Sequence, residues 1–164
     1  MLFRSDSFSV VVTDGTASTS ANAVFNITGT NDAPTLTAAS QSAQLVEAAA
    51  GVTGSSSATI TLTKGDVDTG AVVNYDTSGW TTVSGSSTTF TKTGTYGTAT
   101  LNTSTGVVTY ALDDARAATQ GLTASQAATD TFSVTVKDQY NASASANAVF
   151  NITGTNDAPT LTAE

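Results

Sequence analysis

The chain contains one long segment twice, and this internal repeat constrains the fold more than any other feature. Ser20–Ala38 reads SANAVFNITGTNDAPTLTA, and the same letters return at Ser145–Ala163. The interval between the copies has the length of a whole domain, whereas a solenoid unit repeats every ~20–50 residues. We therefore expect a window onto a tandem array, with one complete repeat and parts of its two neighbours.

Two related strands set the boundaries of these parts. Asp6–Asp14 and Asp130–Asp138 each precede a copy of the repeated segment. We expect the C-terminal hairpin of a preceding repeat over residues 6–33, a complete repeat over 34–158 and the start of a next repeat over 159–164. Residues 1–5 are expected to be a non-native leader, because Leu-Phe-Arg-Ser is what the end of a common sequencing adapter encodes. The alternative is a genuine N-terminal extension.

Composition limits the chemistry that this chain can perform. The 164 residues include no Cys and no His, which removes disulfides, the usual general base and the usual transition-metal ligand. No Ser/His/Asp or Cys/His set can form, so we do not expect an enzyme. The net charge of -8 would repel a phosphate backbone, so nucleic acid is not an expected partner, whereas a hard cation is. No apolar run reaches the ~20 residues of a membrane span, so membrane insertion is not expected.

Alternation of apolar and polar residues predicts about seven strands in the complete repeat. Their spacing of roughly 8–12 residues indicates an all-β Greek-key β-sandwich, preceded by a hairpin of Asp6–Asp14 and Asn22–Thr28. Residues 113–129 are expected to form a long crossing connection, with a short helical turn as the alternative. The expected strands are 35–37 with 44–47, 57–63, 72–75, 88–91, 97–101, 107–112, 130–137 and 146–153. The expected core residues are Ile60, Leu62, Tyr75, Leu101, Tyr110, Phe132, Val134, Phe150 and Ile152.

The linker and the single Trp add two further expectations. Pro34 fixes its own φ and makes Ala33 extended, so residues 29–34 should form a short, stiff connection. Trp80 is expected in the core or at its rim, because large aromatic side chains are usually buried. The alternative is a binding-surface aromatic.

Five motifs occur along the chain in a consistent order. They are DVDTG at Asp66–Gly70, GTYGTATL at Gly94–Leu101, YALD at Tyr110–Asp113, DTFSVTV at Asp130–Val136 and ITGTNDAP at Ile152–Pro159. In this order they resemble the VCBS repeat. The resemblance covers nearly all of Thr35–Pro159, and Asp6–Pro34 is similar to the C-terminal portion of the same family. It implies an Ig-like or cadherin-like β-sandwich from a long, secreted bacterial adhesin or biofilm-matrix protein.

The same residues are similar to the calcium-binding motifs of cadherin domains. Asn31–Pro34 resembles the cadherin linker motif, and Asp66–Asp68 matches its Asp-x-Asp motif. Leu112–Asp114 lies where cadherins carry Leu-Asp-x-Glu, but Ala115 stands where the second acid is expected. The linker also has one acid where cadherins have two. A metal site here should therefore have fewer ligands than the cadherin triple site.

This resemblance implies calcium between successive repeats. Calcium takes 6–8 oxygen ligands, and extracellular modules bind it with dissociation constants of ~10⁻⁴–10⁻³ M. The alternative is that these Asn and Asp residues only form turns through their own backbone. The site at the first linker would use Asn31, Asp32, Asp66 and Asp68, with Asp14 and Asp138 as further candidates. The second would use Asn156 and Asp157 with Glu47, Asp113 or Asp114, completed by the next repeat.

Two functions remain open at this point. The first is a structural extender repeat of a secreted adhesin at the bacterial cell surface, rigidified by calcium and supporting cell adhesion and biofilm formation. Its partners would be neighbouring repeats of the same chain. The second is a β-sandwich module that binds cell-surface glycans or other adhesins. An exposed aromatic platform of Trp80, Tyr75 and Tyr96 would favour the second function, and burial of Trp80 would favour the first.

Overall fold

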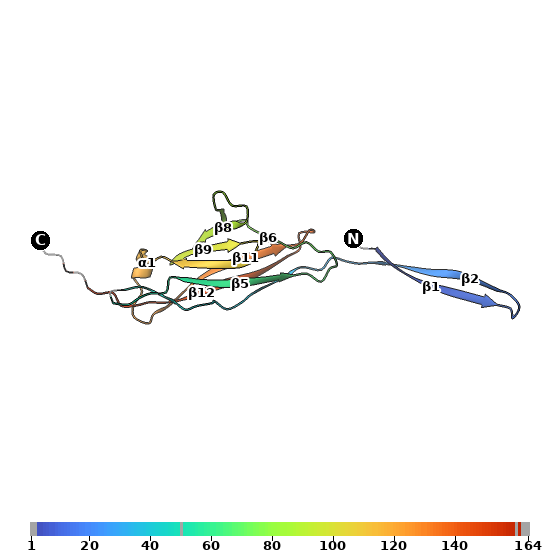
Figure 1. The fold of residues 1–164 in the computed structure, drawn as a ribbon, viewed down its shortest axis with the longest axis horizontal. Helices are drawn as coiled ribbons and strands as arrows, with labels where there is room; N and C mark the ends of the chain where they lie inside the picture. The colour runs from blue at the N-terminus through green and yellow to red at the C-terminus, as the bar shows by residue number, and fades with distance from the viewer. Residues whose placement is uncertain (1–2, 50, 160, 162–164) are drawn as a thin grey trace. The chain divides into compact units, whose positions relative to one another are not determined.

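The computed structural model describes residues 3–49, 51–159 and 161 and divides the chain into two units, one up to Asp32 and one from Ala33. Both units are built from strands, which confirms the all-β class. The first unit is an antiparallel hairpin of β1 (Phe3–Thr13) and β2 (Ser18–Thr28) (Figure 1). Residues 3–5, expected to belong to a leader, pair with residues 26–28 in this hairpin. Met1 and Leu2 lie outside the described residues.

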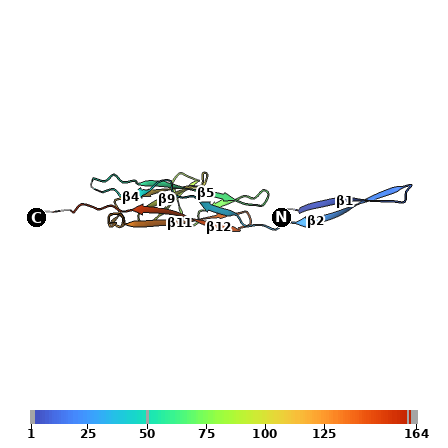
Figure 2. The same cartoon turned by 90° about the horizontal axis from the view of Figure 1, so that it is seen from below.

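The second unit contains two sheets that enclose one core. The six-stranded sheet has the order β3-β5-β10-β9-β8-β7, and the four-stranded sheet has the order β4-β12-β11-β6. All pairs are antiparallel except β4 with β12. Figure 2 shows β11 and β12 in one layer and β5 and β9 in the other. The bounds are β3 Thr35–Ala38, β4 Leu45–Val46, β5 Ser57–Gly65, β6 Asn74–Asp76, β7 Thr81–Thr82, β8 Thr89–Thr93, β9 Gly97–Asn102, β10 Val107–Leu112, β11 Ala127–Lys137 and β12 Ser143–Thr153.

The second unit thus has ten strands in its described residues, and the expectation of about seven was too low. The expected first strand is divided, since β3 pairs with β5 in one sheet and β4 pairs with β12 in the other. The pair Thr81–Thr82 forms β7, a two-residue strand too short to show a periodic pattern. Between β10 and β11 lies a single short helix, α1 (Ala117–Gln120), which matches the alternative of a helical turn.

Period-two alternation explains the core, because it turns every second side chain of a strand inward. Tyr110, on β10, stacks on Phe150, on β12, with ring centroids 4.8 Å apart, and Phe132, on β11, lies 5.9 Å from Tyr110. Eight of the nine expected core residues are buried, and Tyr75 is half-buried at the edge. Trp80 packs at the rim against Phe132, as expected for a core or rim aromatic.

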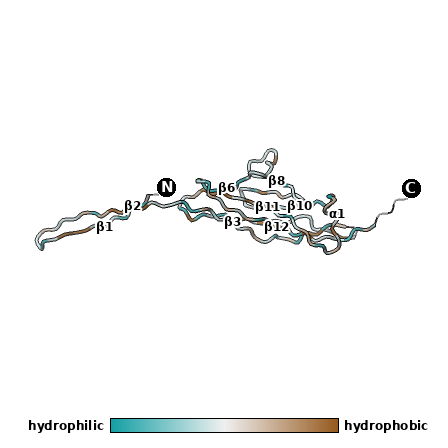
Figure 3. Tube along the Cα trace, turned by 180° about the vertical axis from the view of Figure 1, so that it is seen from behind, coloured by the Kyte–Doolittle hydropathy of each residue, from teal (hydrophilic) through white to brown (hydrophobic). Residues whose placement is uncertain are grey.

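The two hairpins have the same register in different environments. Asp6 pairs with Phe25 in β1–β2, and Asp130 pairs with Phe150 in β11–β12. Phe8 and Phe25 are each 58% exposed, whereas their counterparts Phe132 and Phe150 are 3% and 0% exposed. The hydrophobic stretches of both hairpins are visible in Figure 3. The same apolar face is therefore open to solvent in the first unit and buried in the second.

Candidate functional site

Acidic residues lie near both ends of the β11–β12 hairpin. Each strand has 11 residues, so at ~3.3 Å per residue the two ends lie about 35 Å apart. We call Asp66, Asp68 and Asp138, beside the hairpin turn, the turn-end cluster. Glu47 and Asp114, beside the segment that leaves β12, form with Asn156 and Asp157 the open-end cluster.

The turn-end cluster is formed by two loops. The loop after β5 carries Asp66, whose Oδ1 accepts the backbone N–H of Asp68 at 2.9 Å. The backbone N–H of Val72, later in this loop, donates to Oε1 of Gln139 in the β11–β12 turn at 2.8 Å, which ties the two loops together. Oδ2 of Asp66 is buried and accepts no hydrogen bond. An unsatisfied buried carboxylate oxygen is costly, and a cation would satisfy it.

Asp138 organises the hairpin turn, and Asp14 does the same in the first unit. Oδ1 of Asp138 accepts the N–H groups of Tyr140 and Ala142, each at 2.8 Å. Oδ1 of Asp14 accepts those of Thr16 and Ala17 at 2.9 and 2.8 Å. The bonds from Ala17 and Thr16 lower the pKa of Asp14. Both carboxylates therefore stabilise turns by accepting backbone N–H groups, which is the alternative to metal binding.

The open-end cluster contains the most deeply buried acid of the chain's described part. Glu47 is 0% exposed, and its Oε2 accepts the N–H of Thr155 at 3.0 Å. Its Oε1 is buried and has no hydrogen-bond partner. Asp114 lies beside it, because Oδ1 of Asp114 accepts the N–H of Ala48 at 3.3 Å. Asn156 follows Thr155 directly in the chain and is exposed, and its side-chain amide donates to the carbonyl of Asp157.

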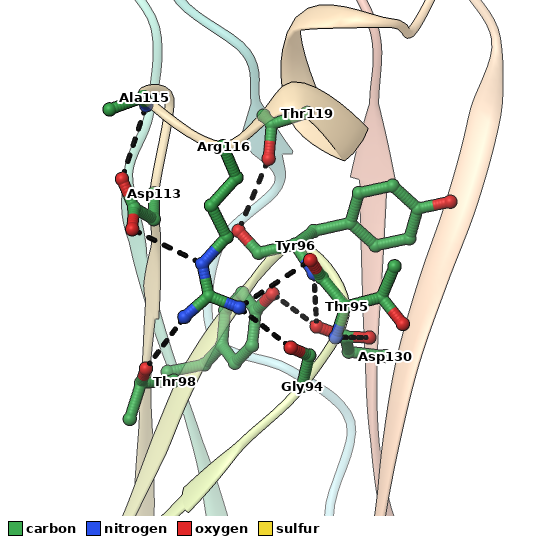
Figure 4. Close-up of polar contacts among 10 residues, drawn as sticks. Gly94, Thr95, Tyr96, Thr98, Asp113, Ala115, Arg116, Thr119 and Asp130 are labelled. Carbon is green, nitrogen blue, oxygen red and sulfur yellow. Dashed lines mark hydrogen bonds and ion pairs between the residues drawn. The ribbon is translucent and has the colours of Figure 1, made fainter.

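Asp113 is engaged elsewhere. Its Oδ2 pairs with Nε of Arg116 at 3.1 Å, and its Oδ1 accepts the N–H of Ala115 (Figure 4). Arg116 also donates to the carbonyl of Gly94 at 2.6 Å and to Oγ1 of Thr98 at 3.2 Å. Of the two adjacent acids offered by the sequence, the structure therefore associates only Asp114 with Glu47.

The donors at the open end fit a hard cation. They are carboxylate, amide and carbonyl oxygens, which suit calcium better than softer metals. Among the residues that the structure describes, no group of three or more acidic side chains is close enough to hold a metal alone. Backbone carbonyls or further residues would have to complete the coordination.

The two copies of the linker share one side-chain hydrogen bond. Nδ2 of Asn31 donates to the carbonyl of Asp32 at 2.8 Å, and Nδ2 of Asn156 donates to that of Asp157 at 3.0 Å. Asn31 and Asp32 belong to the first unit, and Pro34, in the second, is buried. The amide oxygen of each Asn is not used by this bond, so it is compatible with a role as a ligand.

A buried network around Asp130 was not anticipated. Its carboxylate accepts the hydroxyl of Tyr110 at 2.6 Å and the N–H groups of Thr95 and Tyr96 at 2.9 and 3.0 Å. Burial, and then the Asp130 carboxylate, raise the pKa of Tyr110. A Cβ on Gly94 would collide with the Asp130 carboxylate, so only Gly fits at this position. Asp130 lies two residues before Phe132 and four before Val134 on the same strand, so the alternation of the sequence already places its side chain on the inward face.

The aromatic residues of the alternative function do not form an exposed platform. Tyr75, Trp80 and Tyr96 are all half-buried and pack against the core. Nζ of Lys64 lies 5.0 Å from the ring centroid of Tyr75, and Nζ of Lys92 lies 5.7 Å from that of Trp80. These lysines cover ring faces that a sugar would need for stacking.

Comparison with known proteins adds no identification. Neither the protein-family models nor the curated protein sequences contain a match to this chain. The resemblance to the VCBS repeat thus stays a prediction from the motifs. In the described part of the chain, α1 is the only helix, and its four residues are too few to cross a bilayer.

Proposed function

We propose that this chain is a piece of a tandem array of cadherin-like Greek-key β-sandwiches that acts as the extender of a secreted bacterial adhesin. In this proposal, calcium binds at the seams between repeats and makes the array stiff. The array supports cell adhesion and biofilm formation by holding a distal binding domain away from the cell surface.

The observation that carries this proposal is the buried Glu47 carboxylate at one end of the second unit. An unpartnered oxygen on a fully buried acid is a cost that selection for stability alone would remove. A cation shared with Asp114 and the segment from Thr155 onward would offset that cost. The Asp66 carboxylate at the opposite end carries a second unpartnered oxygen, so both ends support a seam. The packing of the half-buried Trp80 on Phe132 also favours the extender over a glycan-binding module.

A calcium titration of the full chain tests the proposal. With a dissociation constant of ~1 mM, about 10 mM calcium would stabilise the second unit by about 1.4 kcal/mol. This corresponds to a rise of about 4 °C in the melting temperature. Glu47→Gln keeps the shape of the side chain and removes its charge, so the calcium-dependent rise should shrink strongly. Asp66→Ala and Asp68→Ala remove carboxylates at the turn end and should also reduce the calcium-dependent rise in melting temperature. Asp6→Asn, on the exposed hairpin, is the matched control and should keep it.

A melting temperature that a chelator and calcium leave unchanged would remove calcium from the proposal. Stiffness is tested separately, by small-angle scattering from a chain with two complete repeats. Equal flexibility with and without calcium would overturn the extender mechanism even if the metal binds.

A further inference from the structure

The exposed face of the β1–β2 hairpin carries the same side chains that β11–β12 buries. Asp6, Phe8, Val10 and Val12 of β1 correspond to Asp130, Phe132, Val134 and Val136 of β11. In β2, the residues Ala23, Phe25 and Ile27 correspond to Ala148, Phe150 and Ile152 of β12. Every one of these β11–β12 residues is buried, and each has an identical counterpart in the first unit.

The differences between the hairpins fall almost entirely on the outward face. Ser7, Val11 and Thr13 replace Thr131, Thr135 and Lys137, which lie on the side of β11 away from the core. Two exceptions occur at strand ends, where Arg4 replaces Ala128 and Thr19 replaces Ala144. The face that contacts the six-stranded sheet is therefore retained along its whole centre.

The geometry of this face is also retained. Phe8 and Phe25 meet edge to face with centroids 6.0 Å apart and an angle of 69°. Their counterparts Phe132 and Phe150 meet at 6.2 Å and 64°. The exposed pair Phe8 and Phe25 thus already has the geometry that Phe132 and Phe150 have when they pack on the six-stranded sheet.

We propose that the β1–β2 hairpin docks on the six-stranded sheet of a second copy of this chain, in the place of that copy's β11–β12 hairpin. Phe25 would stack on Tyr110 of the second copy, and the Asp6 carboxylate would accept its hydroxyl. The N–H groups of Thr95 and Tyr96 of the second copy would complete the same network that Asp130 forms.

Chain length requires a second copy. If β1–β2 replaced β11–β12 of its own chain, Thr28 would stand where Thr153 stands, beside Val46. Thr35 pairs with Gly65 at the opposite, turn end of the sheets. The separation is about 35 Å, and the seven steps from Thr28 to Thr35 span at most about 25 Å. The hairpin therefore cannot reach this place on the sheet of its own second unit, and a second copy of that sheet must receive it.

The resident hairpin competes with the incoming one. It is tethered to its sheet, and Lys137 forms an ion pair with Asp76 at 2.7 Å that Thr13 cannot form. Replacement of the resident hairpin by the incoming one should therefore increase with protein concentration. It should occur when β11–β12 separates from the six-stranded sheet, which happens during unfolding and refolding.

Engineered cysteines provide the test, because the chain has none of its own. Lys137 pairs with Asn74 across β11 and β6, and Thr13 corresponds to Lys137. Chains carrying Thr13→Cys and chains carrying Asn74→Cys are mixed, refolded together at high concentration and oxidised. We expect a mixed disulfide between the two variants, several-fold above the yield for Thr13→Cys with Thr63→Cys. Adding Phe8→Asp to the first variant should abolish the excess, and Phe8 is exposed, so this change does not disturb the second unit.

Lys137→Cys with Asn74→Cys in one chain is the positive control and should close within the chain. Absence of the mixed disulfide under conditions where this control closes would overturn the proposal. Links only between two Thr13→Cys chains would also overturn it, because they indicate hairpins packed face to face. A mixed disulfide that survives Phe8→Asp would do the same.

Discussion

The β1–β2 and β11–β12 hairpins compare two nearly identical sequences in two environments. Both have 11-residue strands with equivalent registers, and both turns are held by an Asp carboxylate. The resident hairpin buries its phenylalanines against the six-stranded sheet, and the first hairpin leaves them in solvent. Local sequence therefore determines the hairpin, whereas burial depends on the sheet opposite it.

The first prediction should give the largest difference between the hairpins. Phe150→Ala should lower the free energy of unfolding of the second unit by about 3–5 kcal/mol, because it opens a cavity against Tyr110. Phe25→Ala, at the equivalent exposed position, should change it by less than about 0.5 kcal/mol. Urea unfolding followed by the fluorescence of Trp80, which packs on Phe132, measures both. Similar losses in the two variants would show that β1–β2 is packed on a sheet in solution.

The second prediction uses the two aspartates. Asp130→Ala should cost about 3 kcal/mol, because the Tyr110 hydroxyl and two backbone N–H groups lose a charged acceptor. Asp6→Ala should leave the same unfolding transition unchanged. If Asp130→Ala also leaves the free energy of unfolding unchanged, the predicted difference between the two aspartates is wrong.

The third prediction concerns the partner of Asp130. Tyr110→Phe should cost about 1.5 kcal/mol at neutral pH, since it removes a hydrogen bond to a charged group. The folded-state pKa of Tyr110 lies above its ordinary value of 10. The wild-type advantage is therefore complete below about pH 10 and declines as the pH rises further. Unfolding curves of both proteins at neutral and alkaline pH measure this. If the difference in free energy of unfolding between the two proteins does not depend on pH, it does not come from the hydrogen bond of Tyr110 to Asp130.

The smallest effect should come from the outward face. Lys137→Thr gives β11 the residue of β1 and removes the ion pair with Asp76, whose pKa Lys137 holds below the ordinary value of 3.8. Exposed pairs contribute little, so the loss should be at the edge of measurement. It should be present above about pH 4 and vanish as the pH falls below that value. A loss that persists in strong acid would assign the effect to packing of the Lys137 stem.

Strands with clear alternation were predictable, and so was most of the core. β5, β9, β10, β11 and β12 each follow the period-two pattern, which depends only on local residues. The parallel pairing of β4 with β12 was not predictable, because it joins Leu45 to Ile152 across more than half the chain. The two-residue β7 gives no periodic signal at all.

The sequence predicted which residues could act as ligands, but it did not predict the contacts that surround them. Glu47 shares the inward parity of Leu45, which foretells burial. Its unpartnered oxygen depends on Thr155 and Asp114, which are distant in sequence. The separation of Asp113 from Asp114 depends on Arg116, whose reach to Gly94 and Thr98 no sequence pattern encodes.

The placement of nearly all differences on the outward face has a genetic consequence. Recombination between the two copies, at any codon of the repeated segment, would join halves whose core-facing residues are the same. The products would differ in the number of domains and would retain the same interior packing. A gene of this kind can lengthen or shorten its protein in a single event, with no new folding problem to solve.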